Sequence, residues 1–209
     1  MGMTDHFIIP KYAHLVGDYI NENLKPGNKV AWLGQQQIGK YSDMFSYINL
    51  KIQVEGLEHH FYDILNEDEP PTNNKWDVHD KWENAIKGYD LVLGLRLAYL
   101  VQSSSGLIRN LKYAVQNNER VMFDFNTGNI VALGPDTLLQ SWPAGSTNLI
   151  PHFKEAIPEG MDMQHSVSHS DNLFTTDMLN QAGLEFGDYS VLKDPIKGRI
   201  YVLAEIIEK

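Results

Sequence analysis

The sequence has 209 residues, no cysteine and a formal net charge of −10, with 43% apolar and 21% charged residues. This composition is that of a soluble globular protein of one domain, and it excludes disulfides, thiolate zinc sites and a cysteine nucleophile. The acidic balance disfavours a nucleic-acid surface, which depends on clustered lysine and arginine. The absence of cysteine fits a reducing cytoplasm, so we expect a cytoplasmic protein. The longest apolar run, residues 91–101, contains Arg96 and is too short to span a bilayer, so no membrane partner is expected.

The first part of the chain predicts a helix followed by a strand, a tight turn and a second helix. Residues 12–24 carry apolar side chains at helical spacing and end at a Pro-Gly pair. Residues 29–33 form a short apolar run, residues 34–40 are polar and bounded by glycines, and residues 41–48 again favour a helix. A strand, tight turn and helix in this order direct backbone N–H groups at a ligand. We therefore expect a small-molecule site where the first strand ends.

The next stretch predicts three further strands and one helix. Residues 50–54 are predicted to form the second strand, and the apolar spacing over residues 58–65 predicts a helix. An acidic loop broken by two prolines follows. Residues 76–82 are predicted to form a short third strand and residues 89–93 a buried fourth strand.

A helix and a fifth strand complete this alternation. Residues 103–106 have the composition of a helix N-cap, and residues 107–116 show an amphipathic helical pattern. Residues 120–125 are predicted to form the fifth strand. Strands that alternate with helices at this spacing predict right-handed crossovers and a mostly parallel sheet.

The remaining chain contains an insert and a terminal hairpin. Residues 126–172 show little periodicity and contain four prolines, which is typical of a functional insert that caps a site. Residues 175–182 are predicted to be helical. The last two predicted strands, 189–192 and 200–207, are joined by too few residues for a parallel crossover, so they must form an antiparallel hairpin.

This order of elements resembles the class I S-adenosylmethionine-dependent methyltransferases, in which the last strand inserts antiparallel into the sheet. The resemblance covers about residues 12–125 and 173–207. It implies a Rossmann-like three-layer α/β sandwich with a mostly parallel seven-stranded sheet and a C-terminal antiparallel hairpin. It also implies S-adenosylmethionine as the cofactor and a small-molecule methyl acceptor as the partner.

The family's first motif places an acidic residue at the end of strand one and a glycine-rich loop after it. The matching stretch here implies that the cofactor contacts Trp32, Gly34, Gln35, Gln36 and Gly39. The sequence departs from the pattern at two positions, because Trp32 replaces the acid and Gln36 replaces the central glycine. Glutamine side chains would then contact the amino-acid part of the cofactor, or the site binds another ligand.

The family also has an acid after strand two, which binds the ribose, and one after strand three, near the adenine. Glu55, 23 residues after Trp32, matches the first of these positions, and a solvated loop acid is the alternative. For the adenine, Asp80 matches, with Trp82 and the Lys81 backbone beside it, and Asp77 is a rival to Asp80.

The segment after strand four usually faces the transferring methyl group in this family. Here it supplies Gly94, which lets a ligand approach the backbone, and Arg96, which either pairs with an acid of the fold or holds an anionic substrate. Tyr99 and Asn126, just past strand ends, are predicted to line the pocket, with ordinary capping or packing as the alternative. His152 and His165 of the insert are candidates for a general base, which is needed only where the acceptor loses a proton.

These patterns lead to the prediction of a methyltransferase that acts on a small molecule. Two alternatives stay open: a methyltransferase-like domain that binds without catalysis, and an NAD(P)-dependent oxidoreductase, which the missing glycine fingerprint disfavours. No metal is expected, although His165, His169 and Asp171 are spaced such that a metal site is an alternative. The oligomeric state cannot be read from the sequence.

Overall fold

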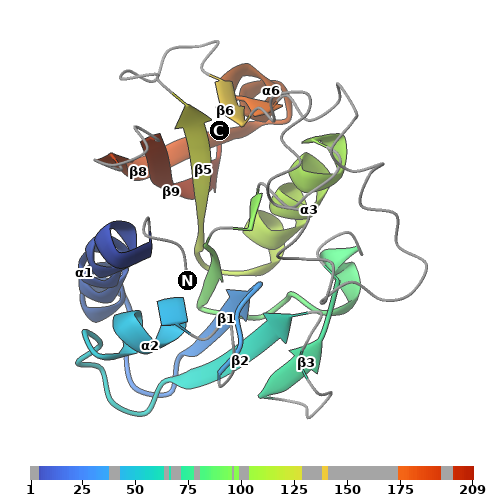
Figure 1. The fold of residues 1–209 in the computed structure, drawn as a ribbon. Helices are drawn as coiled ribbons and strands as arrows, with labels where there is room; N and C mark the ends of the chain where they lie inside the picture. Colours follow the sequence, from blue (N-terminus) through green and yellow to red (C-terminus); the bar gives the residue numbers. More distant parts are fainter. Residues whose placement is uncertain are drawn as a thin grey trace.

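The computed structural model describes residues 5–37, 43–63, 66, 72–77, 81–95, 97–98, 104–128, 138–140, 174–193 and 200–209. Its helices in the described parts are α1 (Asp5–Asn23), α2 (Asp43–Asn49), the 3-10 helix η1 (Trp82–Asn84), α3 (Ser104–Asn117) and α6 (Thr176–Gln181) (Figure 1). Its strands there are β1 (Lys29–Leu33), β2 (Glu58–Asp63), β3 (Asn73–Lys75), β4 (Leu91–Gly94), β5 (Val121–Gly128), β6 (Leu138–Gln140), β7 (Phe174–Thr175), β8 (Leu184–Lys193) and β9 (Ile200–Glu208).

Seven of the strands form one sheet in the order β3-β2-β1-β4-β5-β9-β8. Strands β1 to β5 pair in parallel, whereas β9 is antiparallel to both β5 and β8. The expected mostly parallel seven-stranded sheet is therefore confirmed, and so is the C-terminal antiparallel hairpin. Strands β6 and β7 form a separate antiparallel pair.

Helices cover both faces of the sheet, which makes three layers (Figure 1). On one face α1 and α2 pack against the sheet, with Val16, Ile20 and Ile48 among the fully buried residues of that core. On the other face α3 packs through Leu107 and Leu111. Since neighbouring residues of one strand belong to different cores, as Trp32 and Leu33 do, the central strands are buried on both faces.

Three predicted elements are wrong. Residues 58–65 were expected to be helical, but residues 58–63 form β2, because Phe61 and Tyr62 pack into the two opposite cores. The predicted strand 50–54 is a connecting segment instead. Its backbone bonds to a side chain of α1: Asn21 Nδ2 donates to the Lys51 carbonyl at 3.0 Å, and the Gln53 N–H donates to Asn21 Oδ1 at 2.7 Å.

The third predicted strand is displaced along the chain. β3 comprises residues 73–75, before the predicted stretch 76–82, and residues 82–84 of that stretch form η1. Trp76 and Trp82 are buried against each other with ring centroids 5.7 Å apart, so their apolar character reflects core packing rather than strand pairing. The other predicted strands and helices agree in type with the structure and differ in their ends.

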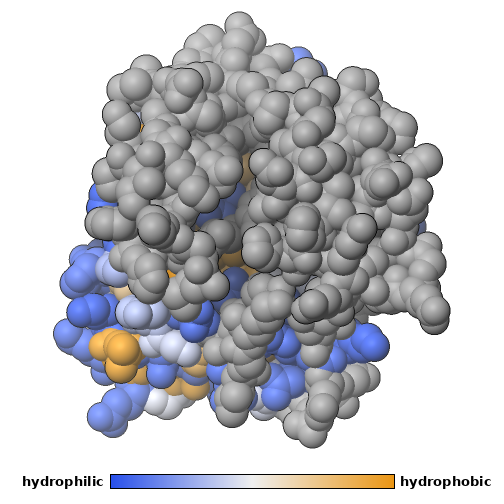
Figure 2. Space-filling model, viewed as in Figure 1, coloured by the Kyte–Doolittle hydropathy of each residue, from blue (hydrophilic) through white to orange (hydrophobic). Residues whose placement is uncertain are grey.

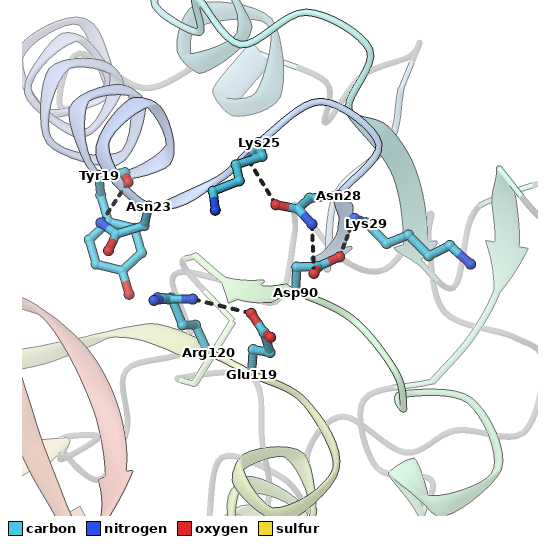
Figure 3. Close-up of polar contacts among 8 residues, drawn as sticks. All are labelled: Tyr19, Asn23, Lys25, Asn28, Lys29, Asp90, Glu119 and Arg120. Carbon is cyan, nitrogen blue, oxygen red and sulfur yellow. Dashed lines mark hydrogen bonds and ion pairs between the residues drawn. The ribbon is translucent and has the colours of Figure 1, made fainter.

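Polar side chains and backbone groups pair with one another at the amino-terminal edge of the sheet (Figure 3). Asp90, just before β4, accepts hydrogen bonds from Asn28 Nδ2 at 2.7 Å and from the Lys29 N–H at 2.6 Å. Beside β5, Arg120 and Glu119 form an ion pair at 3.3 Å. The Asp90 carboxylate thus links the loop before β1 to the segment before β4.

The surface of the described part on the side shown in Figure 2 is mostly hydrophilic, as the charge of −10 leads one to expect, with a small hydrophobic area near α2 (Figure 2). In the described stretches every helix falls short of the length and apolarity that crossing a bilayer requires. The predicted insert, residues 126–172, starts within β5 and includes β6; its residues 129–137 and 141–172 lie outside the described residues.

Candidate functional site

The candidate site lies at the carboxyl-terminal edge of the sheet, where β1, β2 and β4 end side by side. Leu33 of β1 is level with Tyr62 of β2 and with Gly94 of β4. After β1 the chain continues to β2 on one side, and it returns through β3 to β4 on the other side. Such a switch point leaves a crevice outside the carboxyl ends of the strands, where ligands bind in open α/β sheets.

Gly34 forms the tight turn at the end of β1. Its φ is +67°, a left-handed conformation that favours glycine, and its N–H donates to the Tyr62 carbonyl at 2.7 Å. A Cβ at this position would lie 2.8 Å from Leu97 Cδ1. The predicted role of Gly34 in shaping the loop therefore has a structural basis in both its backbone angle and its packing.

Gln35 follows in the same turn and is 6% exposed. Its Nε2 donates to the Leu95 carbonyl, just after β4, at 3.4 Å, whereas its Oε1 is buried without a hydrogen-bond partner. Gln36 is also buried. Gln35 therefore links the end of β1 to the segment after β4 through its side chain.

Asp63, the last residue of β2, is an acid at the carboxyl-terminal edge of the sheet that the sequence pattern did not indicate. It is half-buried, and its carbonyl accepts hydrogen bonds from the Trp76 N–H at 3.1 Å and the Asn66 N–H at 3.2 Å. The helical spacing of residues 58–65 does not indicate that a strand ends at this acid. An acid directly after the aromatic pair Phe61-Tyr62 was the available signal.

The ribose assignment of Glu55 is wrong. Glu55 is exposed and lies in a turn before β2, and in that turn Gly56 accepts a 2.9 Å hydrogen bond from the Gly27 N–H of the loop before β1. This turn is at the amino-terminal edge of the sheet, opposite the carboxyl ends. The alternative of a solvated loop acid agrees with this position.

Two predicted cofactor residues have side chains that belong to the core. Trp32 is fully buried between the sheet and α2; its Nε1 donates to His59 Nδ1 at 3.0 Å and its ring contacts Phe45 edge-on at 5.0 Å. Trp82 is fully buried and stacks on Phe123 with ring centroids 5.7 Å apart. Neither indole ring is available to a ligand, so the expected cofactor contacts of these side chains are wrong.

Gly94 is a glycine for a different reason from the one expected. A Cβ there would lie 2.2 Å from Cε1 and from Cζ of Phe123. The space beside Gly94 is thus occupied by the side chain of β5 rather than left open to a ligand. The prediction that a ligand approaches this backbone finds no support on that side.

Burial shifts the pKa values of three titratable groups in or beside β2, namely His59, Tyr62 and Tyr89. Burial, and to a lesser extent the nearby His60, lowers the pKa of the His59 imidazole below its usual value. Tyr62 and Tyr89 share a buried hydrogen bond between their hydroxyls at 2.5 Å, and burial raises the pKa of both. These two phenols therefore keep their protons and do not serve as general bases at neutral pH.

The other predicted site residues are placed as follows. Lys81 is exposed at the start of η1. Within the described ranges no group of three or more acids and histidines is arranged to hold a metal ion. Six predicted residues lie outside the described residues: Gly39, Asp80, Arg96, Tyr99, His152 and His165.

No model of a known protein family matches this sequence, and no curated protein matches it either. Solved structures do match over nearly the whole chain. One is the 1,6-didemethyltoxoflavin-N1-methyltransferase from Burkholderia thailandensis, solved with 1,6-didemethyltoxoflavin and S-adenosylhomocysteine bound (TM-score 0.51, 13% identity, 99% of this chain and 80% of that one). The fold is that of the class I methyltransferases.

Two further structures support this assignment of the methyltransferase fold. The cyclopropane-fatty-acyl-phospholipid synthase-like protein from Lactobacillus casei has a TM-score of 0.56 and 12% identity, over 96% of this chain and 92% of that one. The N-methyltransferase NodS from Bradyrhizobium japonicum has a TM-score of 0.50 and 8% identity, over 98% of both chains. At such low identities the similarity establishes the methyltransferase fold, and the activity has to be argued from the site.

Proposed function

We propose that this protein is an S-adenosylmethionine-dependent methyltransferase that acts on a small-molecule acceptor. The observation that carries the proposal is the left-handed Gly34 turn at the switch point, where a ligand binds in this fold and where Asp63 ends the neighbouring strand. The matching structures include one solved with S-adenosylhomocysteine and a small heterocycle, which supports both the cofactor and the class of acceptor.

The residues at the carboxyl edge fit this cofactor. Asp63 ends β2 beside the Gly34 turn, where an ionised carboxylate offers only acceptors and binds both hydroxyls of a ribose. Gln35, which follows Gly34 in the turn, is proposed to lie beside the amino-acid part. Gly39 and Asp80 are proposed to complete the loop and the adenine site.

When bound, the cofactor supplies a methyl group on a sulfonium, which an in-line displacement transfers to the acceptor. The protein's contribution is then mainly to orient the two reactants and to exclude water. We propose Arg96, Tyr99, His152 and His165 as the acceptor-side residues. Of these, a histidine acts as a base only if the acceptor loses a proton.

A matched pair of variants tests the cofactor site by isothermal titration calorimetry with S-adenosylhomocysteine. Asp63→Asn removes a charged acceptor of ribose hydrogen bonds and should weaken binding by roughly 10- to 100-fold. Glu55→Gln makes the same chemical change at the opposite edge and should leave affinity unchanged. Absence of binding by the unmodified protein at high micromolar ligand would refute the proposed cofactor.

One observation favours a second candidate, a methyltransferase-like domain that binds the cofactor without catalysis. Trp32 occupies the position at which the family has an acidic residue, and its side chain is fully buried in the core and hydrogen-bonded to His59. Transfer of a labelled methyl group from S-adenosylmethionine to small heterocycles and amines distinguishes the two candidates. Cofactor binding without transfer to any acceptor would favour the second.

A further inference from the structure

β8 is a long strand at one edge of the sheet. It has ten residues and pairs with β9 on one side, and within the described part of the chain no strand pairs with its other side (Figure 1). The opposite edge is less suited to pairing, because β3 has only three residues, two asparagines and a lysine. The free side of a long edge strand presents backbone N–H and C=O groups, which form a template for another strand.

Two exposed apolar side chains lie on one face of β8. Tyr189 is 53% exposed and Val191 is 47% exposed. They stand opposite Ala204 and Val202 of β9, which are buried in the core on the α3 face. Directly opposed residues of paired strands point to the same face of the sheet. Tyr189 and Val191 therefore continue the apolar α3 face of the sheet outward, beyond the buried core.

A bulge limits the part of β8 to which a further strand can be added. The pairing of β8 with β9 is irregular between Phe186 and Tyr189, where two residues of β8 lie opposite one residue of β9. A bulge of this kind bends its strand and increases the twist. A further strand therefore pairs regularly only with the part after the bulge, residues 189–193. The two exposed apolar side chains lie in this part.

We propose that two copies of this chain associate by antiparallel pairing of their β8 strands, with the twofold axis at Ser190. In this register Tyr189 of each copy lies opposite Val191 of the other, because a twofold interface is self-complementary. An aromatic residue opposite a β-branched one is a favourable cross-strand pair. The small Ser190 side chains meet on the other face, where they allow the strands to approach. The two sheets then join into one.

The neighbouring registers fit less well. A centre at Tyr189 places Val191 opposite Gly187, which has no side chain and belongs to the bulge. A centre at Val191 places Tyr189 opposite Lys193, so that an aromatic residue faces a charged one. The centre at Ser190 gives both exposed apolar side chains an apolar partner. Because the strand itself supplies these partners, a second copy fits this edge better than an unrelated strand does.

The pairing is short, so the dimer should be reversible. Stable interfaces bury about 1,200–2,000 Å² in total, and a few strand residues with two apolar side chains from each copy bury less. We therefore expect a dissociation constant in the micromolar range. The association does not depend on the proposed methyltransferase activity.

Sedimentation velocity of the full chain, from low to high micromolar concentration, tests the surface. The unmodified protein should pass from monomer to dimer over this range. Tyr189→Lys and Val191→Glu each place a charge against an apolar residue twice in the dimer, so each should weaken dimerisation by at least about tenfold. Tyr47→Lys is the matched control, because it makes the same change at an exposed aromatic side chain of α2, and it should leave dimerisation unchanged.

A mixture of the two charge variants tests the register. In a mixed dimer the two introduced charges have opposite signs and lie opposite each other, while the second pair keeps Tyr189 and Val191. The mixture should therefore dimerise at least about tenfold more tightly than either variant alone. Circular dichroism of each variant checks that it is folded.

Crosslinking provides a second measurement that needs no charged substitution. The chain has no cysteine, so Ser190→Cys introduces a single thiol next to the proposed axis. A short bismaleimide, which joins two thiols, should produce covalent dimer at least about tenfold faster with Ser190→Cys than with the control Tyr47→Cys.

Three results would overturn the proposal. If the unmodified protein stays monomeric at high micromolar concentration, the edge is left to a strand of another protein. If it dimerises but both charge variants keep the dimer, a different surface associates. If the mixture is no tighter than the separate variants and Ser190→Cys crosslinks no faster than the control, the register centred on Ser190 is wrong.

Discussion

Replacing Gly94 by alanine tests the packing at the carboxyl end of β4. The added methyl group would lie 2.2 Å from two ring atoms of Phe123, where ordinary contacts are 3.4–4 Å. The ring has to move by about 1.2 Å to restore such a contact. It is fully buried and stacked on Trp82, so little space is available for that movement.

The expected cost follows from this confinement. Forcing extra atoms into a well-packed core costs about 1–3 kcal/mol, and the rigid aromatic neighbours of Phe123 place Gly94→Ala near the upper end, at about 3 kcal/mol. For a chain of this length, that corresponds to a fall of about 6–12 °C in the midpoint of thermal unfolding. In a Phe123→Leu background the clashing ring atoms are absent, so the same change should cost less than about 1 kcal/mol.

Urea unfolding of the four proteins of this cycle, followed by circular dichroism, measures both costs. The coupling energy between positions 94 and 123 should be about 2 kcal/mol, with unchanged dependence of the free energy of unfolding on urea. If Gly94→Ala costs under about 1 kcal/mol, or costs as much without the Phe123 ring as with it, the steric account of this glycine is incorrect.

Two further predictions concern buried polar contacts on the α1 face. Because burial lowers the pKa of His59 below 6.5, the unfolded state takes up a proton first as the pH falls below 6.5, and stability is lost from there down to the lowered folded pKa. Urea unfolding at a series of pH values should show this loss of stability in the unmodified protein and in the control His14→Gln, which changes an exposed histidine. The loss should be smaller in His59→Gln. If the free energy of unfolding depends on pH equally in all three proteins, the prediction is wrong. Tyr12→Phe removes the buried 2.5 Å hydrogen bond to the Asp124 carboxylate and should lower the free energy of unfolding by about 1.5–3 kcal/mol, and a change under about 0.5 kcal/mol would contradict this.

The parts of the fold that were predictable from sequence are those with a single simple pattern. β1, β4 and β5 are short apolar runs bounded by turns, and the spacing of apolar residues identifies α1 and α3. The antiparallel hairpin followed from the short connection between its strands, which leaves no room for a crossover.

β2 could not be read in this way because of where its side chains point. Phe61 packs towards α1 and α2 while Tyr62 packs towards α3, so the apolar residues do not alternate. Residues 50–54 have strand-like composition, but the partner of their backbone is the Asn21 side chain rather than another strand. No local pattern reveals such a contact.

The incorrect prediction of residues 58–65 as a helix also limited how much of the candidate site could be predicted. The Gly34 turn follows directly from a recognisable strand, so Gly34 and Gln35 were selected correctly as residues at its end. The position of Asp63 was not predictable because the apolar spacing of residues 58–65 favours a helix, so the acid at the end of the preceding predicted strand is Glu55.

The position of α1 has a consequence for the order in which the structure can form. Tyr12 in α1 bonds to Asp124 in β5, 112 residues later, and the core beneath the helix includes Tyr201 and Leu203 of β9. The helix is synthesised before β5 and β9, so part of the surface that it covers does not yet exist when α1 leaves the ribosome. Contacts so distant in sequence slow folding, and until they form the apolar side of α1 is open to association with other chains.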